Sequence, residues 1–345
     1  MWDRRLHLPD ADAMTITFVI PTLNEAQYLT RCVQSIRRLV RPPSLPDLDI
    51  VIVDTGSTDD TLAIAMSVGA RVFEVPGATV ARARNVGAHG ALSDVLAFVD
   101  ADCELPAQWL VQGIEHLQRP GVAAVGTSLL APPATATWVE RHWHDVTATR
   151  REPYEFVRWL PTSNLLVWRE AFHAVDGFNE TLVTCEDCDF GYRLANAHTL
   201  VLENRIRTRH LRESRTVGEL FRREWWRGLG NFQSWQLQGW DRREFWSVAG
   251  PFLFLALTLA MVLTALLAPT QARPLLLAFE SIALGVIPFF MLLKRGVRPH
   301  GGVMGFARCY ALACVYLVAR GSALINQRKA VEPVRVAKVE WHSHT

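Results

Sequence analysis

Two carboxylates stand one residue apart where an apolar stretch ends. Asp100 and Asp102 follow the run 95–99, whose Val, Leu, Ala and Phe residues predict a buried strand. Two acids in one turn can share a divalent cation, and Mg²⁺ or Mn²⁺ suits hard oxygen ligands and also takes phosphate oxygens of a substrate. Alone, an Asp-x-Asp pair is more often a solvated turn, so it indicates a metal site only together with other residues.

A second group of acids lies in the segment Cys185-Glu186-Asp187-Cys188-Asp189. Repulsion among three neighbouring carboxylates is expected to raise the pKa of at least one, which suits a general base. The alternative is an acid in the first turn of a helix, and Asp189 fits that structural role better than catalysis. Cys185 and Cys188 have the C-x-x-C spacing of a zinc site, but no second pair lies nearby, so we expect no metal there.

The composition bounds the class of protein. The chain has 345 residues, 50% hydrophobic and 20% charged, which is typical of a large α/β domain plus a further region and excludes global disorder. The net charge of +2 gives no basic nucleic-acid-binding surface, so we expect no nucleic acid as a partner. Scattered cysteines favour a reducing compartment. Residues 1–13 carry acids and a proline where a signal peptide needs an apolar core, and are predicted to be an N-terminal extension.

Residues 15 to about 125 predict a sheet that could bring these acids together. Short β-branched runs alternate there with helical patterns, which is typical of a parallel sheet with crossover helices. The predicted strands cover 15–20, 49–53, 71–75 and 95–99, and the predicted helices cover 29–40 and 79–91. In open α/β sheets, ligands bind beyond the carboxyl ends of the strands. The polar segments 21–25, 54–61 and 100–102 are therefore expected to converge on one edge.

Two apolar stretches near the C-terminus are long enough to cross a membrane. Val248–Leu267 is an uncharged run of 20 residues, which matches about 30 Å of hydrocarbon. Pro274–Leu293 is interrupted only by Glu280, which must face protein or be protonated at that depth. Basic residues flank the pair: Arg242 and Arg243 before it, and Lys294, Arg295 and Arg298 after it. The positive-inside rule then predicts a multi-pass protein of the cell membrane with both flanks in the cytosol.

A third apolar segment, 303–325, is harder to assign. Arg308 and Arg320 leave only 11 uncharged residues between them, and a helix of that length spans roughly 16 Å. Crossing would also place the basic residues of 326–345 on the unfavoured side. We expect an interfacial or re-entrant helix, and a true third span is the alternative.

Four motifs occur in a fixed order along the predicted sheet. They are F-V-I-P-T-L-N-E at 18–25, V-D-T-G-S-T-D-D-T at 53–61, A-R-N-V-G-A at 83–88 and F-V-D-A-D at 98–102. With them the chain closely resembles the family 2 glycosyltransferases, nucleotide-sugar-dependent enzymes with the GT-A fold. The resemblance extends to D-G-F-N-E at 176–180 and C-E-D-C-D-F-G-Y-R-L at 185–194. The tail resembles that of a membrane-anchored subset.

The resemblance implies a fold class and a domain order. Residues 14–230 are expected to form an α/β domain of the GT-A fold, a Rossmann-like nucleotide-sugar-binding architecture. An interfacial linker at 231–247, an α-helical membrane region at 248–325 and a basic cytosolic tail at 326–345 are expected to follow. The catalytic domain is expected in the cytosol.

The resemblance also implies roles on the donor side. Pro21, Thr22 and Glu25 would line the nucleoside pocket, and Asp54 would accept a hydrogen bond from the base, since a carboxylate suits a ring N–H. Arg84 would lie near the ribose and diphosphate, where its planar fork favours phosphate oxygens; a surface arginine is the alternative. A UDP-sugar is the first expectation, and GDP- or dTDP-sugars are also compatible with Asp54.

The metal and the catalytic acids follow from the same resemblance. Asp102 would hold Mg²⁺ or Mn²⁺ on the donor diphosphate, with Asp100 closer to the ribose and the outer shell of the metal. His210 is a further candidate for the metal or the diphosphate, although a lone histidine is more often a surface or core residue. Asp187, flanked by Glu186, would be the general base in an inverting transfer to an acceptor hydroxyl.

The need for a general base limits the class of acceptor. A polyprenyl phosphate is ionised near neutral pH and needs no base, whereas a hydroxyl does. The acids at 186–187 therefore favour a hydroxyl on a membrane lipid or lipid-linked glycan, and a polyprenyl phosphate is the alternative. The Trp- and Arg-rich segment 205–246 would hold the domain against an anionic leaflet. Residues 222–227 lack the Gln of the Q-x-x-R-W motif of processive synthases, and the spans are too few for a polymer channel, so we expect non-processive transfer.

Three other classes fit less well. A nucleotidyltransferase would bring a Gly-rich, basic loop after the first strand, and 21–25 contains neither Gly nor Lys. A transporter would show more spans or an intramembrane repeat. An inactive membrane scaffold with the same fold is the remaining alternative, and the presence of Asp54, Asp100, Asp102 and Asp187 together argues against it.

Overall fold

Two compact units make up the described part of the chain. The computed structural model describes residues 14–43, 45, 48–148, 152–242, 244–325 and 340–342. The sheet unit takes the described residues of 1–130, 151–212 and 332–345, and the helical unit takes those of 131–150 and 213–331.

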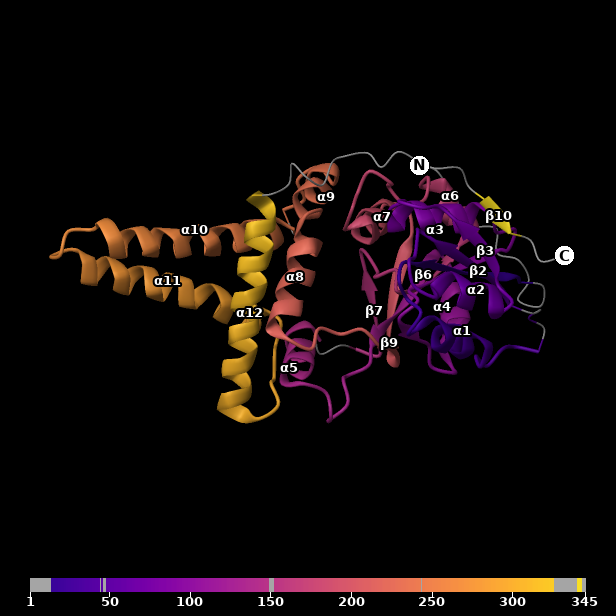
Figure 1. The fold of residues 1–345 in the computed structure, drawn as a ribbon, viewed down its shortest axis with the longest axis horizontal. Coiled ribbons are helices and arrows are strands. Elements are labelled where there is room, and N and C mark those ends of the chain that lie inside the picture. The colour runs from indigo at the N-terminus through magenta and orange to yellow at the C-terminus, as the bar shows by residue number, and fades with distance from the viewer. Residues whose placement is uncertain are drawn as a thin grey trace. The chain divides into compact units, whose positions relative to one another are not determined.

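A mixed sheet is the frame of the sheet unit (Figure 1). Among the described residues it has ten strands in the order β10-β3-β2-β1-β4-β8-β6-β9-β5, and β7 pairs with β9 off this path. The strands are β1 Ile16–Thr22, β2 Asp49–Asp54, β3 Arg71–Glu74, β4 Val95–Val99, β5 Cys103–Glu104, β6 Val122–Leu129, β7 Tyr154–Val157, β8 Asn164–Trp168, β9 Thr199–His210 and β10 Glu340–His342. β1 pairs in parallel with β2 and β4, and β2 with β3, as predicted. β8 runs antiparallel to both β4 and β6, which makes the sheet mixed.

Among the described residues, six helices pack with this sheet. They are α1 Leu29–Arg37, α2 Thr61–Ser67, α3 Val80–His89, α4 Trp109–Leu117, α6 Arg169–Ala174 and α7 Glu186–Ala195. Both predicted helices are present as α1 and α3. Thr79 begins α3 by accepting a hydrogen bond from the backbone N–H of Arg82, which satisfies a donor that the first turn leaves open. A Cβ on Gly87 would lie 2.3 Å from Val19 Cγ1, so glycine is what lets α3 approach β1 closely.

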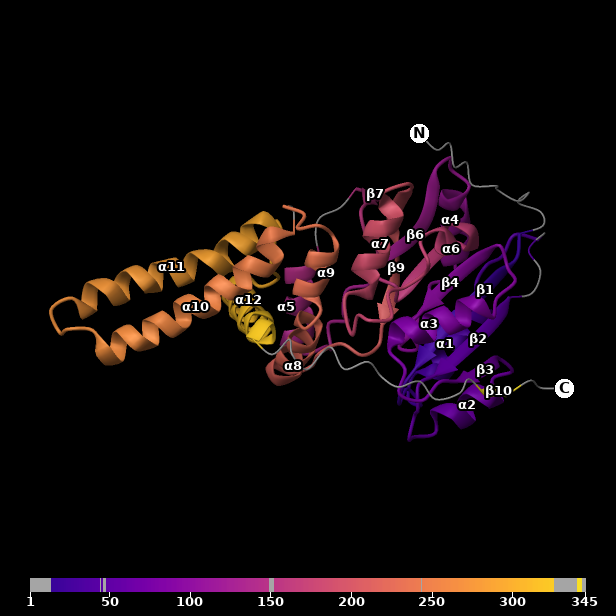
Figure 2. The same cartoon turned by 90° about the horizontal axis from the view of Figure 1, so that it is seen from above.

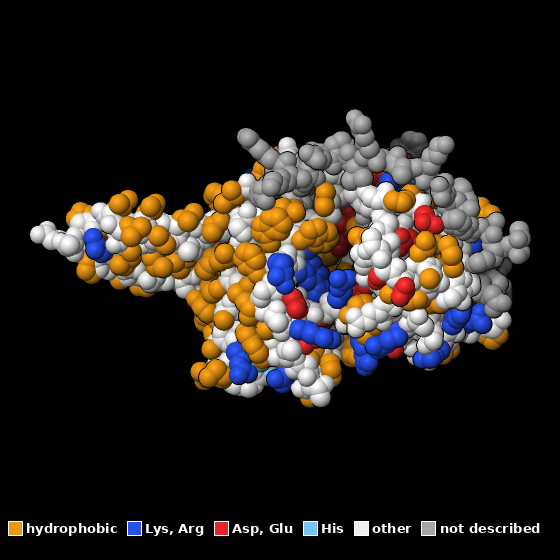
Figure 3. All heavy atoms as spheres, viewed as in Figure 1, with side chains coloured by type: hydrophobic (Ala, Val, Ile, Leu, Met, Phe, Trp, Pro, Cys, Tyr) orange, Lys and Arg blue, Asp and Glu red, His pale blue; other side chains and the backbone are white. Residues whose placement is uncertain are grey.

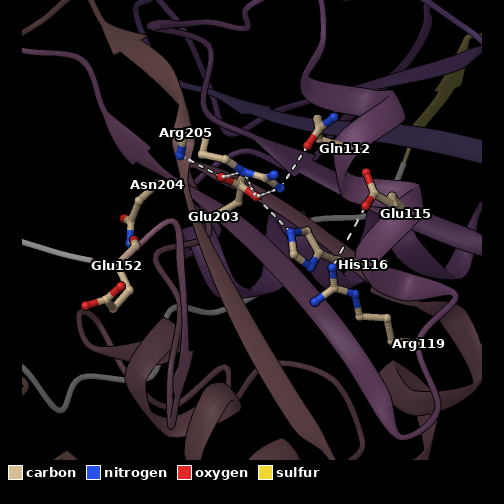
Figure 4. Close-up of polar contacts among 8 residues, drawn as sticks. All are labelled: Gln112, Glu115, His116, Arg119, Glu152, Glu203, Asn204 and Arg205. Carbon is tan, nitrogen blue, oxygen red and sulfur yellow. Dashed lines mark hydrogen bonds and ion pairs between the residues drawn. The ribbon is translucent and has the colours of Figure 1, made fainter.

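A buried ionic cluster fixes β9 against α4 (Figure 4). Glu203 of β9 is fully buried, and its Oε2 lies 2.8 Å from Nε2 of His116 on α4. Arg205 donates to Glu203 Oε2 at 2.7 Å and to Gln112 Oε1 at 3.0 Å. Burial acts to raise the pKa of Glu203, but contacts with Arg205 and His116 outweigh it and lower the pKa to about 2. The cluster holds the strand that ends at His210.

The helical unit is built around an apolar hairpin. Its helices are α5 Trp138–Thr147, α8 Val217–Gly228, α9 Asn231–Leu237, α10 Phe245–Leu267, α11 Arg273–Lys294 and α12 Gly302–Ile325. α10 and α11 form the hairpin, and α12 crosses it at the end remote from its loop and lies beside α8 (Figures 1 and 2). Hydrophobic side chains cover the visible face of the hairpin (Figure 3). The predicted stretches 248–267 and 274–293 lie within α10 and α11.

All three long helices meet the length and hydropathy needed to cross a membrane. In the hairpin, Thr264 Oγ1 donates to Glu280 Oε1 at 2.9 Å, so this carboxyl group faces protein, as expected. In α12, Arg320 lies 2.9 Å from Glu224 Oε2 and donates to Asn231 Oδ1 at 2.8 Å. These partners stabilise the charge of Arg320, which interrupts the apolar segment 303–325 in the sequence. Because α12 crosses the hairpin, an interfacial position for it stays our prediction.

The unit boundary differs from the sequence-based domain boundary. Residues 131–150 and 213–230, which the sequence analysis includes in the 14–230 domain, group with the helical unit. Within the expected tail 326–345, residues 340–342 form β10, which pairs antiparallel with β3. The extension 1–13, the rest of that tail and Arg243 of the basic flank lie outside the described residues.

Candidate active site

The ends of β1 and β2 meet at Asp54. In the parallel register Thr22 lies opposite Asp54, and its Oγ1 donates to Asp54 Oδ2 at 2.9 Å. Asp54 Oδ1 accepts the backbone N–H groups of Gly56 at 2.9 Å and Ser57 at 2.8 Å, while Ser57 Oγ donates to Oδ2 at 2.5 Å. These four bonds shape the turn after β2, and Gly56 takes the φ of +106° that favours glycine. Asp54 thus has a structural role, and its contact with a base stays a prediction.

The segment after β1 contributes an acid that sequence reasoning placed in the nucleoside pocket. Pro21 is half-buried in β1, and Glu25 follows that strand. Glu25 Oε1 accepts from Arg212 at 2.8 Å, an ion pair that no motif indicated. Burial and the nearby Asp102 charge outweigh the effect of Arg212 and raise the pKa of Glu25 to about 7. Glu25 therefore lies within electrostatic reach of the expected metal ligand.

Arg84 of α3 joins the two acidic groups. Its side chain is 4% exposed, so the alternative of a surface arginine is wrong. One terminal nitrogen lies 2.7 Å from Asp100 Oδ1 and the other 2.7 Å from Glu186 Oε1. The planar guanidinium can serve two carboxylates at once, which a lysine ammonium does less well. The middle of α3, the end of β4 and the start of α7 are thereby held together.

Asp102, Cys103 and His210 form the cluster of potential metal ligands found among the described residues. Their ligand atoms all lie within 4.8 Å of one another, and His210 Nε2 is 3.5 Å from Asp102 Oδ1. The antiparallel pairing of β5 with β9 sets Cys103 opposite His210. A carboxylate, an imidazole and a thiol together fit a divalent cation. Asp100 lies outside this cluster, because its carboxylate binds Arg84.

Cys103 is the member of this cluster that sequence reasoning missed. It directly follows Asp102, but a cysteine inside a short strand has no recognisable spacing to other ligands. Its place opposite His210 depends on a pairing between residues more than a hundred positions apart. Only the order of strands in the sheet reveals it.

The first turn of α7 carries the candidate base. Glu186 is buried beside Arg84; burial and the Asp187 charge raise its pKa to about 7, against the opposing effect of Arg84. Asp187 is more exposed, and its Oδ1 accepts the backbone N–H of Cys188 at 2.8 Å. Asp189 pairs with Arg193 at 2.7 Å, in line with the structural role expected for it.

Comparison with known proteins shows what the sheet unit is similar to. Residues 17–177 match the profile of Glycosyl transferase family 2. Glycosyltransferase AglE from Haloferax volcanii is 26% identical over 248 residues, 68% of this chain and 78% of AglE. Pre-mycofactocin glycosyltransferase from Mycobacterium tuberculosis is 29% identical over 195 residues, 53% of this chain. The matched part is 39% of that relative's length.

A solved structure shares the fold. The mannosyltransferase PcManGT from Pyrobaculum calidifontis, in complex with GDP-Man and Mn²⁺, has a TM-score of 0.62 and 17% sequence identity, covering 94% of this chain and 90% of that chain. At this identity the likeness concerns the fold: a mixed α/β sheet of the GT-A type. The chain thus carries a match to the family 2 glycosyltransferase profile over residues 17–177, has glycosyltransferases among its sequence relatives and shares a mixed α/β fold of the GT-A type.

Proposed function

We propose that this glycosyltransferase moves one sugar per encounter from a nucleotide-sugar donor to a hydroxyl group of a membrane lipid or lipid-linked glycan, with inversion at the anomeric carbon. The observation that carries the proposal is the bridge by Arg84, 2.7 Å from Asp100 on the donor side and 2.7 Å from Glu186 beside the candidate base. One buried side chain thus links both halves of the site. Such linkage fixes reacting groups relative to each other, and positioning supplies much of an enzymatic rate enhancement.

The donor side would take the nucleotide at the ends of β1 and β2. Pro21, Thr22, Glu25 and Asp54 line this edge, which is where open α/β sheets bind ligands. A UDP-sugar is the first donor to test. GDP- and dTDP-sugars belong in the same panel, and the GDP-Man bound to PcManGT supports including GDP-mannose.

A divalent metal would be held by Asp102 and His210, with Cys103 as a third donor. When bound, Mg²⁺ or Mn²⁺ would neutralise charge on the leaving nucleoside diphosphate. The nitrogen and sulfur donors place Mn²⁺ ahead of Mg²⁺, which prefers oxygen-only sites. The Mn²⁺ bound to PcManGT supports this order. Asp100 would act through Arg84 and not as a direct ligand.

Asp187 would remove the proton from the acceptor hydroxyl. It is the less buried acid of the pair, whereas one oxygen of Glu186 is bound by Arg84. The N–H of Cys188 holds Asp187 Oδ1, which orients the carboxylate for proton transfer through its other oxygen. Glu186 would position this turn. A polyprenyl phosphate acceptor would need no base, and that is the alternative which the experiment separates.

The helical unit would keep the enzyme on the cytosolic face of the cell membrane. α10 and α11 supply the apolar hairpin. Trp226, Trp240 and Trp246 are substantially exposed, and amphipathic rings of this kind suit the headgroup level of a bilayer. The membrane is therefore both the anchor and the source of the acceptor in this proposal.

The deciding experiment measures nucleoside diphosphate release by the detergent-solubilised full chain. It compares UDP-, GDP- and dTDP-sugars with Mn²⁺ or Mg²⁺, with and without extracted membrane lipids. We expect metal-dependent release from one donor, stimulated by lipid. Asp102→Asn should lower release by about a hundredfold or more, because it removes a charged ligand. Asp49→Asn is the matched control, since Asp49 lies at the opposite end of β2, paired with Arg71.

Three results would contradict the proposal. Release that Asp102→Asn leaves unchanged would remove the metal role. Transfer to a polyprenyl phosphate that survives Asp187→Asn would replace the hydroxyl acceptor by the phosphate acceptor. Absence of both release and nucleotide binding with every donor would favour the inactive scaffold.

A further inference from the structure

Two cysteines bracket the acids at the start of α7. Cys185 precedes the helix and Cys188 lies in its first turn, so the sequence Cys185-Glu186-Asp187-Cys188 encloses both acids. Neither cysteine is in a disulfide, and both are half-buried. The proposed transfer reaction gives these thiols no role. No other pair of cysteines in the chain has this spacing.

The local geometry brings the two thiols together. The Cys185 thiol lies within hydrogen-bonding reach of the Cys188 thiol. Positions three apart on a helix have Cβ atoms about 5–6 Å apart, whereas a disulfide joins residues whose Cβ atoms are about 3.5–4.5 Å apart, so closure needs a local shift of about 1 Å or more. Cys185 has a left-handed φ of 64°, which is uncommon for a residue other than glycine. This turn sets Cys185 directly before the first turn of α7.

We propose that Cys185 and Cys188 form a reversible disulfide by exchange with a low-molecular-weight disulfide such as oxidised glutathione. The Cys185 thiolate attacks one sulfur of oxidised glutathione and releases one glutathione thiolate. The Cys188 thiolate then attacks the Cys185 sulfur of the mixed disulfide and releases the second. Both protein thiol protons end on glutathione. The protein is oxidised by two electrons, and one glutathione disulfide is reduced to two thiols.

The environment of Cys188 indicates which of the two thiols attacks first. The contact with Cys185, burial and the Asp187 charge raise the pKa of the Cys188 thiol well above its ordinary value. A thiol held protonated is a poor first nucleophile. Cys188 therefore resolves the mixed disulfide, and Cys185 makes the first attack.

Closure of the disulfide would disturb the acids that it encloses. Two sulfurs in hydrogen-bond contact must approach to about 2.05 Å, so one or both backbone positions must shift. Glu186 between them is held at 2.7 Å by the buried Arg84 and cannot follow without breaking that bridge. A displacement of about 1 Å at a catalytic group can cost a hundredfold in rate. We therefore expect oxidation to lower transfer, a consequence that rests on the proposed function.

The test uses the purified full chain in detergent, equilibrated with mixtures of reduced and oxidised glutathione. Remaining thiols are alkylated and located by mass spectrometry of peptides. We expect wild type to lose the two alkylation sites at Cys185 and Cys188 together, and dithiothreitol to restore them. Nucleoside diphosphate release should fall at least tenfold in the oxidised protein and recover with dithiothreitol. Cys185→Ser removes the thiol that attacks first and should keep its activity in both conditions. Cys314→Ser, a half-buried cysteine of α12, should respond as wild type does.

The outcomes test disulfide formation and its effect on transfer separately. If Cys185 and Cys188 both stay alkylatable at every glutathione ratio, or if wild type stops at a glutathione adduct on Cys185, the disulfide is wrong. A disulfide that leaves release unchanged would overturn its effect on transfer. If no donor gives release in the reduced protein, the proposed function fails, and the peptide result still decides whether the disulfide forms.

Discussion

Two of the buried ionic clusters, one from each unit, have opposite balances of charge. In the sheet unit, one guanidinium, that of Arg84, is shared by Asp100 and Glu186. In the helical unit, one carboxylate, that of Glu224, is shared by Arg227 and Arg320 at 2.9 Å each. Both clusters join segments that lie far apart in the sequence.

The carboxylates respond to this balance in opposite directions. Burial and Asp187 raise the pKa of Glu186 to about 7, and Arg84 opposes them only in part. Burial also acts to raise the pKa of Glu224, but Arg320 and Arg227 outweigh it and lower the pKa. An acid-rich cluster that titrates near neutral pH suits a reactive site, whereas an arginine-rich one with a fixed charge suits a structural joint. The comparison teaches that the ratio of acids to arginines, more than burial, distinguishes the two.

Arg84→Met should have the largest effect. It leaves Asp100 and Glu186 without their shared cation, and breaking a buried pair in this way costs about 3–5 kcal/mol of stability. We also expect turnover to fall by about a hundredfold, because the two halves of the site lose their common support. Nucleoside diphosphate release and chemical unfolding of the detergent-solubilised protein measure the two effects.

Arg82→Met is the control on the same helix. Arg82 pairs with Glu180 at 2.9 Å, but both side chains are partly exposed, so the loss should stay within about 1 kcal/mol. Arg84→Lys should restore part of the stability and little of the turnover, because an ammonium cannot span both acids. Wild-type turnover in Arg84→Met would make this cluster structural too, and the comparison would fail.

The predictable part of the fold is the part that local patterns determine. β1, β2 and β4 are buried on both faces, so they appear in the sequence as mainly apolar runs. α1 and α3 show helical spacing, and their ends agree with the prediction within a few residues. β5, β6 and β8 escaped prediction, because their mixed pairing depends on contacts between distant segments.

The same distinction holds for the site. The motifs identified Asp102, Arg84 and Glu186 as residues to examine, but not which of them contact each other. The Arg84 bridge joins positions 102 residues apart, and Cys103 meets His210 only through strand pairing. Arg320 was treated as a charge that shortens an apolar run, since its partner Glu224 lies 96 residues earlier. Interactions across such separations require the folded chain.

Arg320→Met should have a smaller effect than Arg84→Met. Glu224 keeps Arg227 as a partner, so the loss should be about 1.5–3 kcal/mol, the range for a hydrogen bond to a charged group. The double variant Arg320→Met with Glu224→Leu should be less destabilised than Arg320→Met alone, because no buried charge is left behind. Thermal unfolding in detergent measures both. Arg308→Met, on the exposed face of α12, is the control and should change little. Additive losses in the double variant would show that the pair does not act as a unit.

The pH dependence should give the sharpest test of the comparison. The pKa of Glu186 is raised to about 7, so its contribution to stability is fully present below its unfolded value near 4.5 and is lost as the pH rises through 7. Glu186→Gln should remove this dependence between about pH 4.5 and 7, whereas Glu115→Gln, an exposed acid of α4, should not. Glu25, also raised to about 7, should leave a residual slope that Glu25→Gln removes. Unfolding midpoints across that pH range measure this dependence.

The pKa of Glu224 is lowered, so its pH dependence has the opposite sign. The contribution of Glu224 to stability is present above its unfolded pKa and is lost as the pH falls below that value. If Glu186→Gln and Glu224→Gln changed the slope in the same direction, the ratio of acids to arginines would not be what separates the two clusters.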